Sequence, residues 1–181
     1  MNPTEPVEIV CAHSPDSDDA FMFYGLATKK IRSRRLTFRH MLEDIESLNR
    51  RAMEGQYHLT AISYHAYPYI ADKYFLMASG SSVGDGYGPM VVSTQPLEPS
   101  ELKGKRIAIP GKKTTAYLVL KLFEQDFEPV VTPFDAIIDA VKDRMVDAGL
   151  IIHEGQLTFS TSGSRQLFSY HASGVPSSKR Q

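Results

Sequence analysis

Hydrophobic and polar positions along the chain follow two alternating patterns. Short apolar runs are typical of buried strands, and they occur at 7–12, 36–41, 59–62, 74–78, 90–93, 106–109, 129–131 and 148–152. Between them, apolar residues recur at helical spacing over 21–26, 42–53, 114–123 and 134–141, with a short helical turn at 64–69. Strands that alternate with helices predict an α/β protein with mostly parallel sheets.

The pattern is interrupted once and then restarts. A glycine-rich stretch at 80–89 is followed by the proline-containing segment 93–100, which is typical of a boundary between domains. We therefore expect two lobes with a cleft between them, a first α/β lobe over 1–92 and a partial second lobe over 93–159. Residues 160–181 contain no acidic side chain, and their apolar positions fit neither period, so we expect a disordered tail there.

Composition excludes several classes of protein. The 181 residues include 20 Lys+Arg and 21 Asp+Glu, and this net charge of -1 argues against nucleic acid or an anionic membrane as partner. No apolar stretch reaches the roughly 18 residues of a membrane span, and the first residues lack the basic and apolar parts of a secretory signal. The single cysteine, Cys11, lies within an apolar run, which predicts a core position and fits a cytoplasmic protein.

Polar residues follow the first predicted strand, at the usual ligand position of open α/β sheets. Ser14 and Ser17 could donate hydrogen bonds to an anion at the start of the next helix. Asp16, Asp18 and Asp19 would repel an anion, and they fit either helix capping or a divalent cation. The sequence leaves capping, ligand contact and metal binding open at this loop.

A second strand–turn–helix segment carries basic residues and two threonines at 105–115. It resembles a Walker motif only loosely, because six residues separate Gly104 from Gly111 where that motif has about four, so a nucleotide triphosphatase is weakly supported. Thr114 and Thr115 could instead hold an anionic group at the helix N-terminus together with backbone amides. The alternative is that Thr114 is a plain helix N-cap.

A histidine ends the last predicted strand. His153 follows the apolar run 148–152, and a histidine at this edge can act as a general base because its pKa lies near neutrality. His13 and His65 are expected along the same edge, and a purely structural role for His153 stays open. The sequence lacks the Gly-x-Ser-x-Gly, Cys-x-x-Cys and His-Glu-x-x-His patterns of serine hydrolases, redox enzymes and zinc proteases, and we expect no metal site.

Six segments in order resemble one known family. They are SPDSDDAFMFY at 14–24, LEDIESLN at 42–49, TAISY at 60–64, GYGPMVV at 86–92, PGKKTTAY at 110–117 and AGLIIHE at 148–154. Together they resemble the MqnA/MqnD family of the futalosine route to menaquinone, over about residues 7–159. The last two segments are most similar to its 1,4-dihydroxy-6-naphthoate synthase branch.

The resemblance implies a fold, a reaction and a set of site residues. The fold would be a two-lobed α/β fold like that of type II periplasmic binding proteins, with an incomplete second lobe here. The reaction would be a lyase-type conversion of cyclic dehypoxanthinylfutalosine to 1,4-dihydroxy-6-naphthoate in the cytoplasm, without a cofactor. By motif match His153 would be the catalytic base, and Asn49, Ser63, Thr114 and Thr115 would contact the small-molecule substrate, with Ser14 added from the strand-end argument.

Two other functions stay open at this stage. The same family contains chorismate dehydratase, and the two-lobed fold also serves non-catalytic binding proteins for small anions. Family members continue beyond the His-Glu strand, whereas 160–181 match nothing in that region, so we expect a C-terminally shortened chain whose activity is uncertain. As alternatives to substrate contact, Asn49 would face solvent on its helix and Ser63 would cap the following turn. The sequence does not give the oligomeric state.

Overall fold

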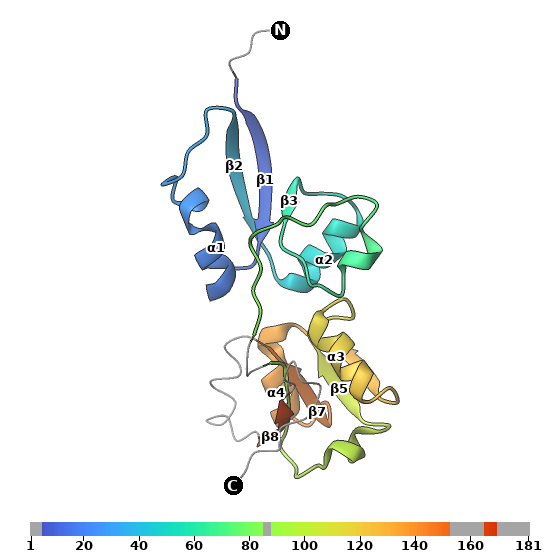
Figure 1. Ribbon diagram of the computed structural model, residues 1–181. Coiled ribbons are helices and arrows are strands. Elements are labelled where there is room, and N and C mark those ends of the chain that lie inside the picture. Colours follow the sequence, from blue (N-terminus) through green and yellow to red (C-terminus); the bar gives the residue numbers. More distant parts are fainter. Residues whose placement is uncertain (1–4, 85–87, 153–164, 170–181) are drawn as a thin grey trace. The chain divides into compact units, whose positions relative to one another are not determined.

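The computed structural model describes residues 5–84, 88–152 and, for the backbone, 165–169 (Figure 1). The chain forms two compact units, Met1–Ser82 and Val83–Gln181, so the division lies about ten residues before the expected boundary at 92. Each unit has its own sheet and its own core. None of the helices in the described ranges is long and apolar enough to cross a membrane.

The first unit is a three-stranded parallel sheet with strand order β2-β1-β3. Its elements are β1 (Val7–His13), α1 (Ser17–Ala27), β2 (Leu36–Leu42), α2 (Ile45–Met53), β3 (Leu59–Thr60) and a 3-10 turn, Tyr67–Tyr69. These bounds agree with the predicted pattern within a few residues, apart from the shorter β3. Successive side chains of a strand point to opposite faces of the sheet. Neighbouring residues of β1 therefore contact different helices.

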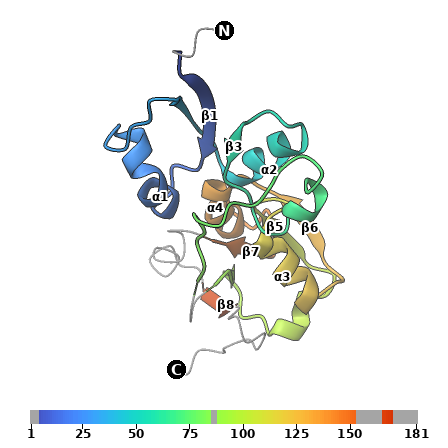
Figure 2. The same ribbon diagram turned by 45° about the horizontal axis from the view of Figure 1, so that its top comes forward.

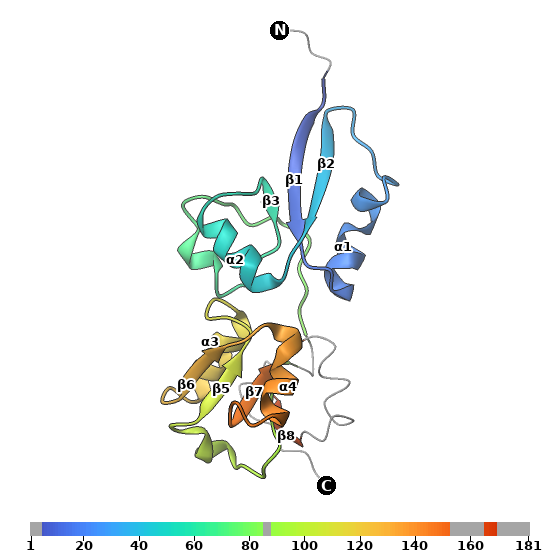
Figure 3. The same cartoon turned by 180° about the vertical axis from the view of Figure 1, so that it is seen from behind.

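The two helices of this unit cover opposite faces of β1 (Figures 1 and 3). His13 stacks on Phe23 of α1, with ring centroids 4.3 Å apart, whereas the neighbouring Ala12 packs in a cluster with Leu48 of α2. Cys11 is fully buried, which confirms its predicted core position. Burial, followed by the charge of Asp19, raises the pKa of the Cys11 thiol to about 11, so this cysteine is not an activated nucleophile.

The prediction of a strand at 74–78 is wrong. This segment forms no strand within the described part of the unit, and Phe75 is 97% exposed. Tyr74 is anchored to the rest of the unit, since its hydroxyl accepts a hydrogen bond from the Tyr57 N–H and donates one to the Tyr57 carbonyl, at 3.3 and 2.8 Å. An apolar run becomes a strand only where a neighbouring strand edge is free to pair with it.

The second unit has a five-stranded mixed sheet with strand order β6-β5-β7-β4-β8. Its elements are β4 (Met90–Ser93), a 3-10 turn at Pro99–Leu102, β5 (Arg106–Ile109), α3 (Thr115–Phe123), β6 (Glu128–Val131), a 3-10 turn at Phe134–Ala136, α4 (Ile137–Lys142), β7 (Ala148–Ile151) and β8 (Arg165–Ser169). Strands β6, β5 and β7 run parallel, and β4 is antiparallel to both β7 and β8. The predicted α/β class with mostly parallel sheets is confirmed.

Strand β8 lies within the segment expected to be a disordered tail. Residues 165–169 pair with β4 in antiparallel register, with a shift between Val91 and Val92. The expectation is wrong for these five residues. They form a strand because they pair with β4, which lies about seventy positions earlier in the chain. Such long-range pairing leaves no periodic signal in the local sequence.

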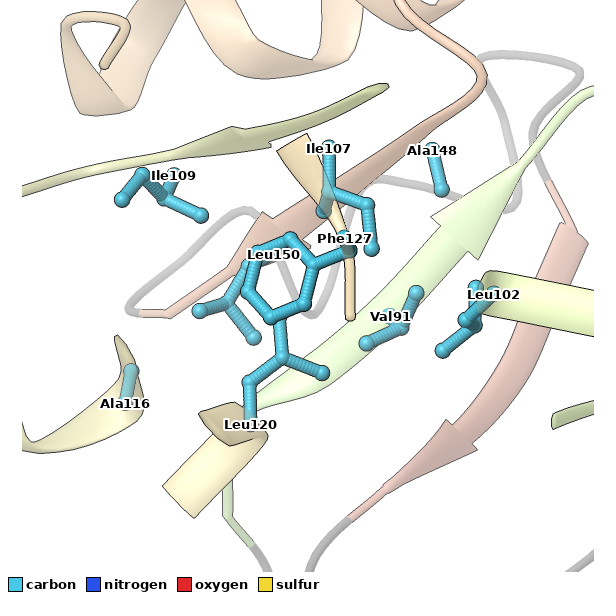
Figure 4. Packing of buried hydrophobic residues seen from close by; sticks show 9 residues of the cluster. All are labelled: Val91, Leu102, Ile107, Ile109, Ala116, Leu120, Phe127, Ala148 and Leu150. Atoms are coloured by element: carbon cyan, nitrogen blue, oxygen red, sulfur yellow. The ribbon is translucent and has the colours of Figure 1, made fainter. Parts of the chain in front are cut away.

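Helices α3 and α4 cover the two faces of this sheet (Figure 2). Alternate strand residues supply two cores. The α3 side contains Val91, Leu102, Ile107, Ile109, Ala116, Leu120, Phe127, Ala148 and Leu150 (Figure 4). The α4 side contains Met90, Val92, Ala108, Ile137, Val141, Val146 and Ile151. A sheet covered on both faces accounts for the unbroken apolar runs of its strands.

Candidate functional site

The predicted site residues of the first unit lie where parallel strands end. Ser14 follows β1, and Ser63 follows β3 by three residues. The strands stay paired up to this edge, because the Glu43 N–H donates to the His13 carbonyl at 3.2 Å and the Ala61 N–H donates to the Ala12 carbonyl at 2.9 Å. The carboxyl edge of a parallel sheet is where open α/β proteins bind ligands.

Ser14 is held tightly in its own loop. Its side chain and backbone are only 3% exposed. The Ser14 N–H donates to the Asp19 carboxylate at 2.7 Å, and the Ser14 hydroxyl accepts from the Asp16 N–H at 2.9 Å. These bonds give Ser14 a structural role at the start of α1, and its contact with a substrate stays a prediction.

The acidic cluster shapes the start of α1. The helix begins after Asp16, so of the three aspartates that the sequence offered for capping, Asp16 takes the N-cap position. The Asp18 carboxylate accepts from the Asp19 N–H at 2.9 Å. Asp19 is 6% exposed, and burial raises the pKa of its carboxyl against the opposing hydrogen bond from Ser14. Within the described ranges no group of three or more His, Cys, Asp or Glu residues could hold a metal ion.

Asn49 and Ser63 are brought together across the unit. Asn49, on α2, is fully buried. Its Oδ1 accepts a hydrogen bond from the Ser63 N–H at 2.9 Å, and its Nδ2 donates to the Ser63 hydroxyl at 3.1 Å. The alternative that Asn49 only faces solvent is therefore wrong. Helix α2 is itself fixed by Asp44, whose carboxylate accepts from the Ser47 N–H at 3.0 Å at the N-cap.

Glu43 joins the two ends of the α2 region. Its Oε2 lies 2.8 Å from the Arg51 Nε, and its Oε1 accepts a hydrogen bond from the Tyr57 hydroxyl at 3.0 Å. Burial, with a further contribution from Glu43, raises the pKa of Tyr57, so this phenol stays protonated and continues to donate. The arrangement ties the segment before α2 to the segment after it, and sequence reasoning assigned none of these residues a role.

The second unit places two of the predicted residues at the start of α3. Thr114 is the N-cap and is 1% exposed, and its hydroxyl donates to the Gly111 carbonyl at 2.8 Å and accepts from the Tyr117 N–H at 3.2 Å. Thr115 is the first helical residue and is partly exposed. The geometry thus supports the capping interpretation of Thr114, while anion binding by this helix start stays a prediction. His153 lies outside the described residues.

Sequence reasoning missed a pair of histidines beside the Ser14 loop. His13 Nε2 lies 3.0 Å from His40 Nδ1, and His13 Nδ1 lies 3.0 Å from the Ser14 carbonyl oxygen. A carbonyl only accepts, so His13 Nδ1 carries a hydrogen and the two facing nitrogens share a single proton. The parallel register of β1 with β2 creates this pair, and no local pattern could have found it.

The histidine pair predicts a loss of stability at mildly acidic pH. Burial, followed by the charge of His13, lowers the pKa of His40 in the folded state, and the described residues offer its buried Nε2 no partner. An unfolded histidine titrates near pH 6.5, so the unfolded state binds the proton first. The stability contributed by neutral His40 is therefore complete above about pH 6.5 and is lost as the pH falls below it.

Melting temperatures measured from pH 7.5 to pH 5 check this prediction. The decrease below pH 6.5 should be shallower in His40→Gln, which keeps a hydrogen-bonding side chain but does not titrate. His58→Gln is the matched control, because His58 is an exposed histidine whose Nδ1 accepts a hydrogen bond from the Val10 N–H. An equally steep decrease in His40→Gln would contradict the assignment.

The chain is similar to several known proteins. The model of a family described as menaquinone biosynthesis matches residues 9–169. A curated relative from Thermus thermophilus, named 1,4-dihydroxy-6-naphthoate synthase, is 43% identical over 154 residues, which are 85% of this chain and 56% of the relative. A relative of the same name from Streptomyces coelicolor is 34% identical and covers 91% of this chain and 61% of its own length. The chain therefore spans little more than half the length of these relatives.

Solved structures support the fold. A protein from Archaeoglobus fulgidus is 52% identical, with a TM-score of 0.84 over 90% of this chain and 60% of its own. An alkanesulfonate-binding protein from Xanthomonas axonopodis, solved with MOPS, has a TM-score of 0.68 at 17% identity, over 94% of this chain and 63% of its own. The latter shows the periplasmic-binding-protein-like fold alone. On the match of the family model, the chain belongs to the menaquinone biosynthesis family.

Proposed function

We propose that the chain carries the reaction for which its relatives are named, the lyase-type formation of 1,4-dihydroxy-6-naphthoate from cyclic dehypoxanthinylfutalosine. The observation that supports this most is the 43% identity to the Thermus thermophilus enzyme over 85% of the chain. The carboxyl edge of the first sheet, where Asn49 holds Ser63, is consistent with it. Because the chain spans only part of its relatives, the activity has to be measured on this chain itself.

In this proposal His153 removes a proton from the substrate, and fragmentation of the cyclic substrate follows. Ser14, Ser63 and Thr115 supply hydrogen-bond donors for the carboxylate and hydroxyl groups of the substrate, and Thr114 fixes the start of α3 as its N-cap. The start of α3 adds backbone N–H groups, which favour negative charge. The proposed reaction takes place in the cytoplasm and uses no redox cofactor.

The test is turnover by the purified chain. Incubation with cyclic dehypoxanthinylfutalosine should yield the naphthoate, identified by chromatography and mass spectrometry, and incubation with chorismate should yield no product. Product from chorismate would assign the chain to chorismate dehydratase instead. Recovery of unchanged, bound futalosine derivative would indicate a binding protein and contradict the proposal.

Replacing His153 with glutamine should lower kcat by about 10²- to 10⁴-fold, since this is the usual contribution of a general base. Substrate affinity, measured by calorimetry, should stay largely intact because only the proton transfer is lost. His58→Gln serves as the matched histidine control and should turn over at the wild-type rate. Undiminished turnover by His153→Gln would refute the role of this residue.

A further inference from the structure

The two hydrogen bonds between Asn49 and Ser63 have a fixed direction. The Ser63 backbone N–H can only donate, so the atom of Asn49 that faces it at 2.9 Å must be the carbonyl oxygen Oδ1. The amide nitrogen Nδ2 then faces the Ser63 hydroxyl at 3.1 Å, and it can only donate. The orientation of the amide is therefore determined by the backbone of Ser63.

Asn49 is unusual for its place in the molecule. It is 0% exposed and lies within α2, where asparagine is a poorer helix former than alanine by roughly 0.7 kcal/mol or less. A buried polar side chain is tolerated when its groups are paired, and here both ends of the amide are paired with one residue. With no exposed surface, Asn49 is placed to hold Ser63 rather than to touch a ligand.

The fixed Asn49 amide decides whether the Ser63 hydroxyl accepts or donates in the hydrogen bond between them. Because Oγ accepts from Asn49, the hydroxyl hydrogen of Ser63 is not used in that bond. Across the ranges that the structure describes, the Asn49 amide is the side-chain partner recorded for Ser63 Oγ. Ser63 is partly exposed at the carboxyl edge of the sheet, so the hydroxyl can donate outward.

We propose that Asn49 is a positioning residue that presents the Ser63 hydroxyl as a hydrogen-bond donor to a carboxylate oxygen of the ligand. The inference rests on the proposed function and deepens it, because it replaces the expected direct contact of Asn49 with an indirect role. It also gives this part of the site a preference for ligand groups that accept hydrogen bonds.

The Asn49→Asp variant tests whether the direction of the hydrogen bond between residue 49 and the Ser63 hydroxyl matters for binding. Aspartate has nearly the same shape, and one of its oxygens still accepts from the Ser63 N–H. Its other oxygen replaces the Nδ2 donor, so it accepts from the Ser63 hydroxyl and turns that hydrogen inward. Affinity for 1,4-dihydroxy-6-naphthoate, measured by calorimetry at pH 8, should fall about ten- to hundredfold, the usual loss for one charge-assisted hydrogen bond.

Two further variants separate polarity from stability and from charge. Ser63→Ala removes the donor without burying a charge, keeps the Asn49 bond to the residue 63 N–H, and should lose a similar factor of affinity. It supplies the measurement if Asn49→Asp does not fold, which circular dichroism shows. Arg50→Asp adds a carboxylate to the same helix at an exposed position away from the N-cap and should bind like the wild type.

Affinity measured at lower pH separates the proposed role of Asn49 from a purely structural one, because a structural role would not make the affinity depend on pH in this way. Protonation of the introduced aspartate restores a donor toward Ser63, so the affinity of Asn49→Asp relative to wild type should recover as the pH falls. In the double variant Asn49→Asp/Ser63→Ala there is no hydroxyl to reorient, and affinity should stay at the Ser63→Ala level at every pH. A recovery in the double variant would show simple charge repulsion and overturn the proposal.

The outcomes distinguish this inference from the proposed function. Normal affinity in Ser63→Ala, or in a folded Asn49→Asp at pH 8, overturns the inference even if the wild-type chain turns over its substrate. The predicted pattern of affinities in a chain that yields no product supports the inference and refutes the proposed activity. A wild-type chain that neither binds the naphthoate nor forms it refutes both.

Discussion

Replacing Leu48 with alanine is expected to lower the free energy of unfolding of the first unit by about 2–5 kcal/mol. Leu48 is fully buried on α2 and forms a small core with Ala12 and Tyr57. The loss contains the transfer free energy of the missing carbons and the cost of the cavity that they leave. Such a loss is a large part of the roughly 5–15 kcal/mol that usually stabilises a domain.

Urea unfolding followed by circular dichroism measures this effect, with Leu42→Ala as the matched control. Leu42 is 60% exposed at the end of β2, so its truncation should change stability by no more than about 0.5 kcal/mol. Equal midpoints for the two variants would show that Leu48 is not a core residue. Because Leu48 directly precedes Asn49, its loss should also weaken ligand binding at temperatures where α2 begins to detach.

Replacing Gly149 with valine is expected to destabilise the second unit by about 3 kcal/mol or more, above the 1–3 kcal/mol usual for added methylenes in a packed core. Gly149 lies in β7 on the face covered by α4. A Cβ atom there would lie 2.6 Å from Ile137 Cγ2 and 2.8 Å from Val141 Cγ2. Both neighbours are about 1% exposed and β-branched, so they cannot turn aside easily.

Thermal unfolding of Gly149→Ala, Ile137→Ala and their combination checks this cause. The smaller Gly149→Ala change should already destabilise the unit, and Ile137→Ala should leave a cavity. In the combination the new Cβ partly fills that cavity, so the loss should be smaller than the sum of the two single losses. A strictly additive result would mean that α4 moves away from the sheet and that the close approach is not rigid.

The periodic parts of the fold could be read from the sequence. The strands β1, β2 and β5 and the helices α2 and α3 were predicted within a few residues, because their burial repeats at the spacing of a strand or a helix. The family segments were also visible, since they are continuous stretches. Cys11 was recognised as core from its apolar neighbours alone.

The predictions for two segments were wrong for the same physical reason. The segment 74–78 is apolar but finds no strand partner in the described unit, and 165–169 has little periodicity yet pairs with β4. In both cases the outcome depends on whether a distant strand edge is available. Pairing of this kind depends on the assembled sheet, so local composition misjudged both segments.

The candidate site, like the fold, was predictable only where it depends on continuous stretches of sequence. The sequence by itself determined the α/β class, the family and the residue types at the strand ends, because each of these depends on continuous stretches of chain. Only the tertiary structure decided that Asn49 is buried against Ser63, that Ser14 is held by Asp19, and that His13 meets His40. Hydrogen bonds join atoms from separate strands and helices, and their direction follows from which donors and acceptors the fold brings within about 3 Å of each other.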